Sequence, residues 1–438
     1  MTTLTKNLLR LDGWKNLLSG MGGRRDKTRY TRPSPVTRLS DIELAALYYG
    51  DPIAADAVDY LPEDMTKAGF EVNGDTGELE QAFNELHGPE KFKEALAYTE
   101  LYGGAIILMD IEGSGTYDQP YDPAKGKKVR ALRVYPRTRI DLGRMQQVVL
   151  PESPYFEDYE QFVIRKIDGS TFTAHASRCL IFKSPIRVDP TMAGFVDYER
   201  YWGLSAVLRY YDAVAAYGTL IQGLTHLSQE LAVGKYKLSN LEQLVAEGDY
   251  RSINRRMDAI DTQKSIVNGV LLGEGEDYTR EQLTLSGVDA LTDRFMMHVA
   301  AATRYSVTKL FGRSAAGMNA TGEGDDDNYV EYISGLQKIQ LLPPLLKLMQ
   351  CLNESLKVVK DDSGKAGKVV INFNPLSKRD QLREAQVREA MSRADRNYVE
   401  AGILSGDEII RNRFQGGYAI DTVVDNDFVP DLSEEEEA

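Results

Sequence analysis

The sequence predicts an α+β fold that is mainly helical, and three patterns support this prediction. Between residues 105 and 182, short apolar runs alternate with turn residues, which is typical of strands. From residue 205 onward, apolar residues recur at intervals of three and four, which is typical of amphipathic helices. The length of 438 residues allows two to four folding units, and a content of 42% apolar and 27% charged residues is that of a globular protein.

The first 200 residues combine helix signals with strand signals. Ser40 followed by Glu43 is a helix-start pattern, and apolar residues recur beyond it as far as Val58. A second helix is expected over residues 89–100. Together with the strands, these elements predict an α+β domain that ends near Tyr201. The strands are expected at residues 105–109, 129–134, 147–150, 161–167 and 179–182.

A long helix is predicted from Ser205, and its apolar stripe contains small residues. Gly218 and Gly223 each cost a helix about 1 kcal/mol relative to alanine. Small residues allow another backbone to approach closely, so this stripe is expected to pack against a neighbouring helix. The stripe consists of Val207, Tyr211, Val214, Gly218, Ile221 and Leu224.

The region after this helix is expected to alternate between helix and irregular chain. Residues 241–261 are predicted to be helical, and residues 265–272 to form a strand or hairpin. Another helix is expected over residues 288–303. The glycine-rich stretch 310–324 is predicted to be a loop, because glycine permits backbone angles that other residues avoid.

The last part of the chain begins with a further long helix. Three consecutive aspartates from Asp325 suit the positive end of a helix dipole. Pro343-Pro344 falls inside the helical pattern and predicts a kink, after which the helix continues to Leu356. A strand over residues 368–373 and charged helices over residues 377–400 are expected to follow.

Charge and cysteine content exclude several classes of protein. Acidic residues outnumber basic ones by 66 to 52, a net charge of −14, whereas tight nucleic-acid binding by phosphate neutralisation needs the opposite sign. Two cysteines, Cys179 and Cys351, are too few for a disulfide framework or a cysteine-based zinc site, which favours a reducing compartment. Charged residues interrupt the most apolar stretch, residues 207–227, so no membrane contact is expected.

The sequence offers no convincing catalytic, metal or cofactor site. The glycine-rich stretch lacks the Lys and Ser/Thr of a phosphate-binding loop and carries Glu323 and Asp325 instead. Consecutive aspartates on a helix point in different directions and are poor joint metal ligands. Two His-x-Ser pairs, at His175 and His226, leave open a phosphodiesterase of the two-histidine type. Structural histidines are the favoured interpretation, so no catalytic residue, metal or cofactor is predicted.

Several short motifs nevertheless resemble one family. The motifs are Tyr201-Trp202-Gly203-Leu204-Ser205, Val299 to Gly312 with the sequence VAAATRYSVTKLFG, Gly317 to Glu323 with the sequence GMNATGE, Gln337 to Pro344, Tyr102-Gly103-Gly104-Ala105, His175-Ala176-Ser177-Arg178 and Ala401-Gly402-Ile403-Leu404-Ser405. Through these motifs the chain resembles tailed-bacteriophage portal proteins, also called head-tail connectors, over most of its length, from about Ser40 to Glu408.

This resemblance implies a ring, usually of about twelve subunits, at one vertex of a phage capsid. DNA is pumped through such a ring by the terminase motor and later leaves through it into the tail. The short C-terminal region makes a long helical crown unexpected. The implied parts are a flexible arm (1–35), an α+β wing (36–200), a first stem helix (203–233), a clip (234–285), a second stem helix (286–304), a tunnel loop (305–324), a kinked helix (325–358) and a C-terminal wing and crown with an acidic tail (359–438).

The resemblance also implies a site and a set of partners. The tunnel-loop residues expected to face the channel are Lys309, Arg313, Ser314, Met318, Asn319 and Thr321. They would touch DNA phosphates transiently, while the acidic balance of the chain keeps the duplex sliding. Alternatively, Lys309 and Arg313 pair with Glu323 or Asp325 of a neighbour. The implied partners are other copies of the chain, double-stranded DNA, the large terminase subunit, the major capsid and scaffolding proteins, and a head-tail adaptor.

The implied location is the virion, with assembly in the host cytoplasm and no enzymatic activity. Two other interpretations stay open from the sequence. One is the two-histidine phosphodiesterase that would use His175 and His226. The other is a different ring-forming adaptor protein of a phage head or tail.

Overall fold

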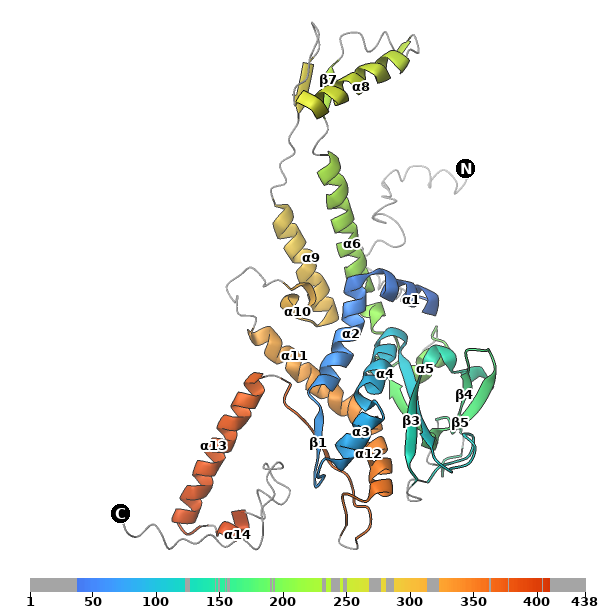
Figure 1. Cartoon of the computed structure of the whole chain (residues 1–438), viewed down its shortest axis with the longest axis vertical. Coiled ribbons are helices and arrows are strands. Elements are labelled where there is room, and N and C mark those ends of the chain that lie inside the picture. The colour runs from blue at the N-terminus through green and yellow to red at the C-terminus, as the bar shows by residue number, and fades with distance from the viewer. Residues whose placement is uncertain are drawn as a thin grey trace, which may run out of the picture. The chain divides into compact units, whose positions relative to one another are not determined.

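The computed structural model describes residues 38–409, and the chain divides into two compact units (Figure 1). The first unit contains Met1–Arg209 and Glu323–Ala438, and the second contains Tyr210–Gly322. The described part is mixed α/β and mainly helical, as predicted. The predicted arm, residues 1–35, lies outside it. So do residues 123–126, 146, 149, 154, 156–157, 190, 192–193, 231–233, 238–244, 247–249, 268–276, 281–286, 313–322, 362–363, 377 and 404.

The first unit begins with two helices rather than one. In α1 (Asp41–Gly50), Ser40 Oγ accepts a hydrogen bond from the Glu43 N–H, and Glu43 Oε2 accepts one from the Ser40 N–H at 2.7 Å. The helix stops at Asp51, whose side chain caps α2 (Pro52–Lys67) by accepting hydrogen bonds from the next two free N–H groups. Pro52 lacks an N–H and suits a first helical position, so the chain restarts a helix there.

A three-stranded antiparallel sheet of order β3-β2-β6 forms the core of the first unit. Its central strand β2 (Gly104–Ile111) pairs with β3 (Val129–Pro136) and β6 (Cys179–Lys183). All five residues from Ala105 to Met109 are fully buried, which explains why this stretch is continuously apolar rather than alternating.

Different elements cover the two faces of this sheet. Helix α4 (Gly88–Tyr102), preceded by α3 (Glu78–Glu85), packs on one face through contacts such as Phe92 with Phe182. The hairpin of β4 (Gln161–Arg165) and β5 (Thr171–His175) packs its apolar residues with Ile106 and Leu108 on the other. The turns η2 (Arg137–Arg139), η3 (Leu142–Arg144) and η4 (Ala176–Arg178) connect these strands.

Two strand predictions in this region need correction. In the predicted strand 147–150, the described residues Gln147 and Val148 make bridge contacts only, Gln147 with Tyr159 and the Val148 N–H with the Asp158 carbonyl at 2.9 Å. Strand β5 was not predicted, because Thr171-Phe172-Thr173-Ala174-His175 has a mixed composition and gains its strand partner only across the hairpin turn at Asp168-Gly169.

The sheet also fixes the start of the long helix α6 (Val207–Glu230). Trp202, the last residue of α5 (Asp197–Trp202), is fully buried against Gly104, where an added Cβ would lie 2.3 Å from the indole ring. The backbone of Ala206 then donates a hydrogen bond to the Glu100 carbonyl at 2.9 Å. Helix α6 therefore begins at a position set by the C-terminal end of α4.

The predicted kink near Pro343-Pro344 takes the form of a π-helical turn. Helix α11 (Glu323–Leu336) continues through the wider turn η5 (Gln337–Leu341) into α12 (Leu342–Leu356). In a regular α-helix, a proline ring clashes with the carbonyl group four residues earlier. The wider π turn contains an extra residue and so makes room for the two rings.

Three side chains tie this long helical segment to the rest of the first unit. Tyr329 donates a hydrogen bond to Asp64 at 2.6 Å, and Gln337 donates one to the Met65 carbonyl at 2.9 Å. The Lys347 ammonium donates to two backbone carbonyls, those of Ala176 and Cys179, at 2.9 Å each. Burial lowers the pKa of Lys347, because it disfavours the charged ammonium group. The two carbonyl acceptors stabilise that charged form.

The C-terminal elements are shorter or simpler than predicted. Strand β9 (Ile371–Phe373) pairs with β1 (Phe70–Val72), and the preceding residues 368–370 are not part of the strand. One continuous helix, α13 (Lys378–Glu400), replaces the several charged helices that were expected. The short helix α14 (Gly406–Ile409) ends the described chain.

The described residues of the second unit include most of α6, a strand pair and the helices α8, α9 and α10. Strand β7 (Gly234–Lys237) pairs antiparallel with β8 (Asp277–Arg280), and helix α8 (Tyr250–Val267) lies between these two strands in the sequence. Helix α9 (Val288–Thr303) matches its predicted bounds, and α10 (Val307–Phe311) follows it. Residues 265–267 are helical rather than strand-like, because no helix breaker precedes Gly269; residues 268–272 lie outside the described part.

Glu100 is a buried carboxyl beside the base of α6. Burial raises the pKa of its carboxyl from 4.5 to about 7, although Arg209 and the amide of Gln340 lower it. In the unfolded chain this carboxyl ionises near its ordinary pKa. Between about pH 4.5 and 7 the folded chain therefore holds a proton that the unfolded chain releases.

We expect the free energy of unfolding to fall as the pH rises through this window, by ~3 kcal/mol in total from Glu100. Glu100→Gln stays neutral at every pH and removes this loss. Urea unfolding at pH 4.5 and pH 8 measures this change in the free energy of unfolding. Glu90→Gln, on the exposed side of α4, is the control. Equal pH dependence of Glu100→Gln and wild type would contradict the prediction.

Candidate functional site

The segment predicted as a tunnel loop begins with a short helix. Helix α10 starts at Ser306, whose Oγ accepts a hydrogen bond from the Lys309 N–H at 3.2 Å. It ends at Gly312, a residue with left-handed backbone angles (φ +65°) that closes the last turn. Residues 307–311 are thus helical rather than loop, because a good N-cap and a good C-cap lie just far enough apart for one turn.

Side chains anchor α10 within the second unit. Leu310 is buried, and the ring of Phe311 lies 5.3 Å from that of Tyr217 on α6. Helix α10 also packs against α9. The chain that follows Gly312 therefore departs from a fixed position in this unit.

The structure describes one of the six predicted channel residues. Lys309 lies on α10 and is half-buried. The other predicted channel residues lie outside the described part, so their contact with a channel stays a prediction. They are Arg313, Ser314, Met318, Asn319 and Thr321.

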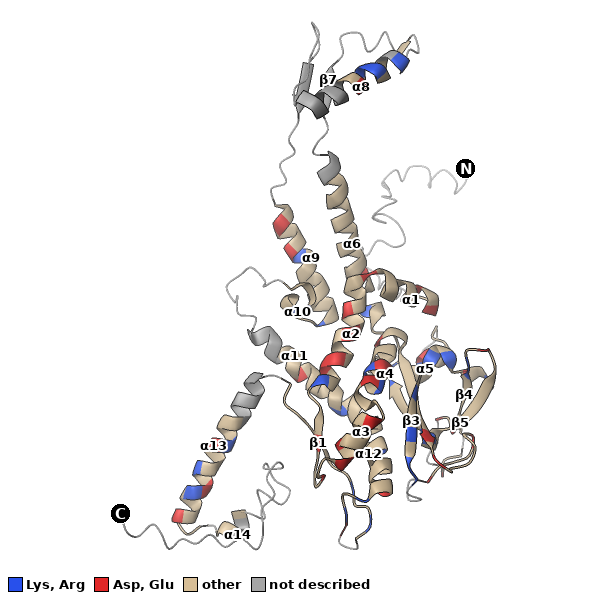
Figure 2. Cartoon of the chain, in the orientation of Figure 1, with Lys and Arg blue, Asp and Glu red and all other residues tan. Residues whose placement is uncertain are grey.

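Helix α6 presents a long surface without charge. Seventeen consecutive residues, from Ala213 to Gln229, include no Lys, Arg, Asp or Glu. Figure 2 shows α6 almost free of charged residues along its described length. The hydroxyls of Thr219 and Thr225 donate hydrogen bonds to backbone carbonyls one turn earlier in the same helix, at 2.8 and 2.9 Å. Their polar groups are therefore satisfied within the helix itself, and Ile221 is 38% exposed.

Nothing in the described chain explains the two glycines of α6. A Cβ added at Gly218 or Gly223 would meet no atom within 4 Å. Glycine weakens a helix, and no contact among the described residues requires it at either position. Helix α9 likewise leaves apolar side chains at the surface, since Leu291 and Met297 are each 44% exposed.

The two histidines of the phosphodiesterase hypothesis lie in different units. His175 ends β5 and is buried; the Ser177 N–H donates to its Nδ1 at 3.1 Å, so the proton resides on Nε2, 3.3 Å from Glu160 Oε1. Its ring also meets Tyr155 edge-on at 5.7 Å. His226 lies exposed on α6. Both nitrogens of His175 are engaged in structural contacts, which suits a packing role better than proton transfer.

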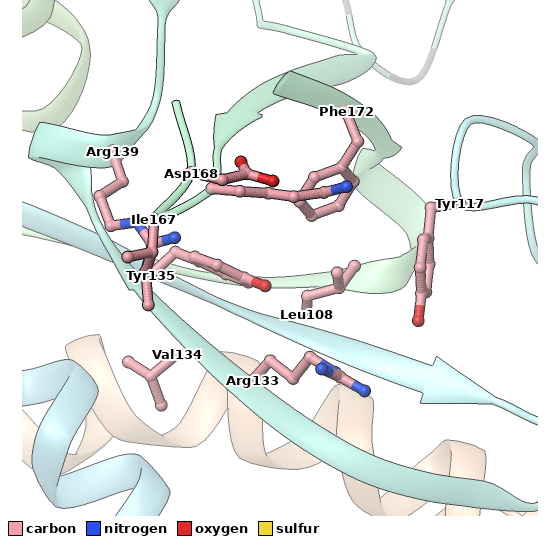
Figure 3. A pocket seen from close by; sticks show the side chains of 10 residues that line it. Leu108, Tyr117, Arg133, Val134, Tyr135, Arg139, Ile167, Asp168 and Phe172 are labelled. Carbon is pink, nitrogen blue, oxygen red and sulfur yellow. The ribbon is translucent and has the colours of Figure 1, made fainter. Parts of the chain in front are cut away.

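A pocket of about 820 Å³ in the first unit was not predicted (Figure 3). It lies between β3 and the β4–β5 hairpin turn and is lined by three basic side chains, Arg133, Arg139 and Lys166. Sequence patterns could not reveal it, because the three come from separate elements that only the folded sheet brings together. The sequence Asp168-Gly169 is typical of a turn but carries no signal of binding residues.

Neither a metal centre nor a membrane span is found in the described part of the chain. Across the described ranges, no group of three or more His, Cys, Asp or Glu residues is placed to hold a metal ion. No helix in the same part of the chain is both long enough and apolar enough to cross a bilayer.

The chain belongs to the phage portal protein family, whose profile matches residues 42–397. This match covers the sheet, α6, the β7–β8 region, α9, α10 and the segment from α11 to α12. The family resemblance drawn from the motifs is thereby confirmed.

Three curated relatives align with most of the chain. Two are named anti-CBASS protein Acb1, from Caulobacter sp. (strain RHG1) and Sphingomonas paeninsulae; they are 24% and 28% identical over 80% and 77% of this chain. The chain spans only 57% and 55% of those two relatives. The third, an uncharacterised protein of Haemophilus influenzae, is 26% identical over 93% of this chain and 90% of its own length.

Solved structures show a similar fold. One chain from the neck of a native gene transfer agent (GTA) particle, determined with C12 symmetry, has a TM-score of 0.50 and 13% identity over 84% of this chain and 92% of its own length. A chain from the neck of the empty particle, determined with C6 symmetry, has a TM-score of 0.51 and 14% identity over 87% and 95%. At this identity the likeness concerns the fold alone.

We expect His175→Ala to destabilise the protein by about 2 kcal/mol, because it removes a buried ring and leaves the half-buried Ser177 without its hydrogen-bond partner. His226→Ala, at an exposed position, should change stability by less than about 0.5 kcal/mol. Chemical denaturation measures both. Hydrolysis of a cyclic or linear phosphodiester by the wild type, lost in both variants at unchanged stability, would instead support the phosphodiesterase hypothesis.

Proposed function

We propose that this chain is a portal subunit that assembles into a closed ring of about twelve copies around a DNA channel at one vertex of a phage capsid. The family match over residues 42–397 carries this proposal. The fold shared with a neck chain solved in a C12-symmetric particle supports the ring and its approximate copy number. The uncharged surface of α6 supports the use of this helix between copies.

A ring suits a helix whose apolar surface finds no partner in its own chain. In a ring, each copy offers one surface to the next copy and a different surface to the previous one, and rotation closes the assembly. Such contacts would bury Ile221, Leu291 and Met297. They would also give Gly218 and Gly223 a function, because a neighbouring helix could approach the bare backbone there.

In this proposal the parts of the chain follow the family order. Residues 36–200 form the wing, α6 and α9 are the stem helices, and residues 234–285 form the clip. Residues 305–324 form the tunnel loop, with α10 as its fixed base. The π turn η5 lies within the long helix of residues 325–358, and the C-terminal residues 359–438 complete the wing and a short crown.

The channel lining would let DNA slide. A net charge of −14 per copy repels phosphates, so a ring of copies does not hold the duplex tightly. Lys309, Arg313, Ser314, Met318, Asn319 and Thr321 would supply weak, transient contacts from the tunnel loop. The same ring would serve genome packaging by the large terminase subunit, genome retention, ejection and head-tail joining through an adaptor, in contact with the major capsid and scaffolding proteins.

The proposed role is structural and not enzymatic, and it places the protein in the virion. The anti-CBASS name belongs to relatives of which this chain spans little more than half, so the activity in that name is not transferred. The number of copies per particle and their position in the particle distinguish a portal from another ring-forming adaptor protein.

We expect Gly218→Leu and Gly223→Leu to leave each subunit folded, because both positions face open space and leucine favours helix. The added side chains should block the approach of the neighbouring helix and shift the population from rings to single subunits. Native mass spectrometry and negative-stain electron microscopy measure this. Gly335→Leu on α11, also a helical glycine in open space, is the matched control. A wild type that stays monomeric under all assembly conditions would overturn the proposal.

We expect the double charge reversal Lys309→Glu with Arg313→Glu to leave ring formation intact and to lower DNA packaging or retention several-fold, because cations that touch phosphates become repulsive. Packaged DNA per particle, measured at low and high salt, tests this. If the two cations instead pair with Glu323 or Asp325 of a neighbour, the same variant should weaken the ring itself. Arg304→Glu, next to the segment but outside the predicted set, serves as the comparison.

A further inference from the structure

The unpredicted pocket of the first unit combines positive charge with exposed apolar groups. Arg133 comes from β3, Arg139 from the turn η2, and Lys166 from the hairpin turn after β4. Asp168 is the single acidic side chain among the lining residues, and its carboxylate is occupied by Ser170, whose N–H and hydroxyl donate to it at 2.9 and 2.7 Å. The lining therefore carries three positive charges and one negative charge.

The basic groups of the pocket are incompletely neutralised. Arg133 lies 3.6 Å from Asp110, but Arg130 shares that carboxylate at 3.3 Å. Arg139 donates through Nε to the Arg165 carbonyl, a neutral partner, at 2.9 Å. The chain as a whole carries a net charge of −14, whereas the lining of this pocket carries an excess of positive charge. The pocket therefore favours an anionic ligand.

Aromatic side chains form the rest of the wall. Tyr117 and Tyr135 each lie about 6 Å from the ring of Phe172, at 5.8 and 6.1 Å between centroids. Figure 3 shows these rings around the hollow, with Leu108 at its floor. Cations already cover two of them: Arg139 lies 5.0 Å from the centroid of Tyr135, and Lys166 lies 5.7 Å from that of Phe172. A stacked nucleobase would have to displace those contacts, which favours a different anionic ligand.

The rim of the pocket offers an apolar contact. Ile167, at the tip of the hairpin, is 96% exposed although it borders the hollow. A large aliphatic side chain so exposed beside cations and aromatic rings fits a peptide that carries both acidic and apolar residues. Nucleic acid would need more phosphate contacts than three cations supply.

We propose that this pocket binds the acidic C-terminal segment of the chain, residues 421–438, from the same or a neighbouring copy. That segment contains eight acidic residues and no Lys, Arg or His. Its apolar pair Phe428-Val429 lies between Asp427 and Asp431. The segment lies outside the described residues, so the match rests on its sequence: carboxylates for the three cations and apolar side chains for the exposed Ile167. The proposal does not depend on ring formation.

The test places a photo-crosslinking phenylalanine analogue at position 428 of the full chain. We expect crosslinks to peptides that contain residues 133–139 or 166–172, identified by mass spectrometry. Mixing isotope-labelled and unlabelled copies separates capture within one chain from capture between copies, and either result supports the proposal. Added free peptide of residues 421–438 should compete, and high salt should weaken the crosslink.

Charge reversal supplies the decisive comparison. Lys166→Glu, at an exposed position where folding should be unaffected, combined with Arg139→Glu should lower the crosslink yield about tenfold, as expected for the loss of about two ion pairs. Lys128→Glu with Arg144→Glu makes the same change in net charge away from the lining and should keep the yield. Lys166→Glu alone tests the same contact if the double variant does not fold. Crosslinks to other surfaces, or a yield that is insensitive to Lys166→Glu, would overturn the proposal.

Discussion

Burial of the central strand β2 on both faces is the constraint on which the first unit depends. Its residues Ala105 to Met109 are fully buried, so one face must be covered by α4 and the other by the β4–β5 hairpin. Since α4 runs directly into β2, its C-terminal end is fixed beside the sheet, and Glu100 there accepts the backbone hydrogen bond that starts α6. The first residues of α6 are therefore fixed beside the sheet, and the β4–β5 hairpin and β3 also shape the basic pocket.

The second unit has the opposite character, because α6 and α9 leave apolar side chains exposed at their surfaces. A single copy gains little from the uncharged stretch of α6, and its glycines weaken the helix. These features become favourable only if other copies supply the missing contacts. Within the proposed ring, the subunit divides its tasks: the first unit folds around its own core, while the helices of the second unit are completed by assembly.

The sequence predicted best where local signals were complete. Helix α9 matched its expected bounds because its apolar residues recur at helical spacing throughout, and the irregularity near Pro343 was located because proline cannot continue a regular helix. Local signals misled where tertiary partners decide: Gln147 and Val148 form only bridge contacts, and β5 gained a partner only across a hairpin. The cap pair Ser306 and Gly312 made a helix inside an expected loop. The basic pocket was invisible, because Arg133, Arg139 and Lys166 converge only in three dimensions.

The two hydrogen bonds from Lys347 have a mechanical consequence. Its ammonium joins helix α12 to the carbonyls of Ala176 and Cys179, which belong to η4 and β6. If α12 slid along its axis, a cation would be stranded in an apolar interior, at a cost far above that of breaking a surface contact. An axial displacement of α12 is therefore opposed by the sheet through these two hydrogen bonds.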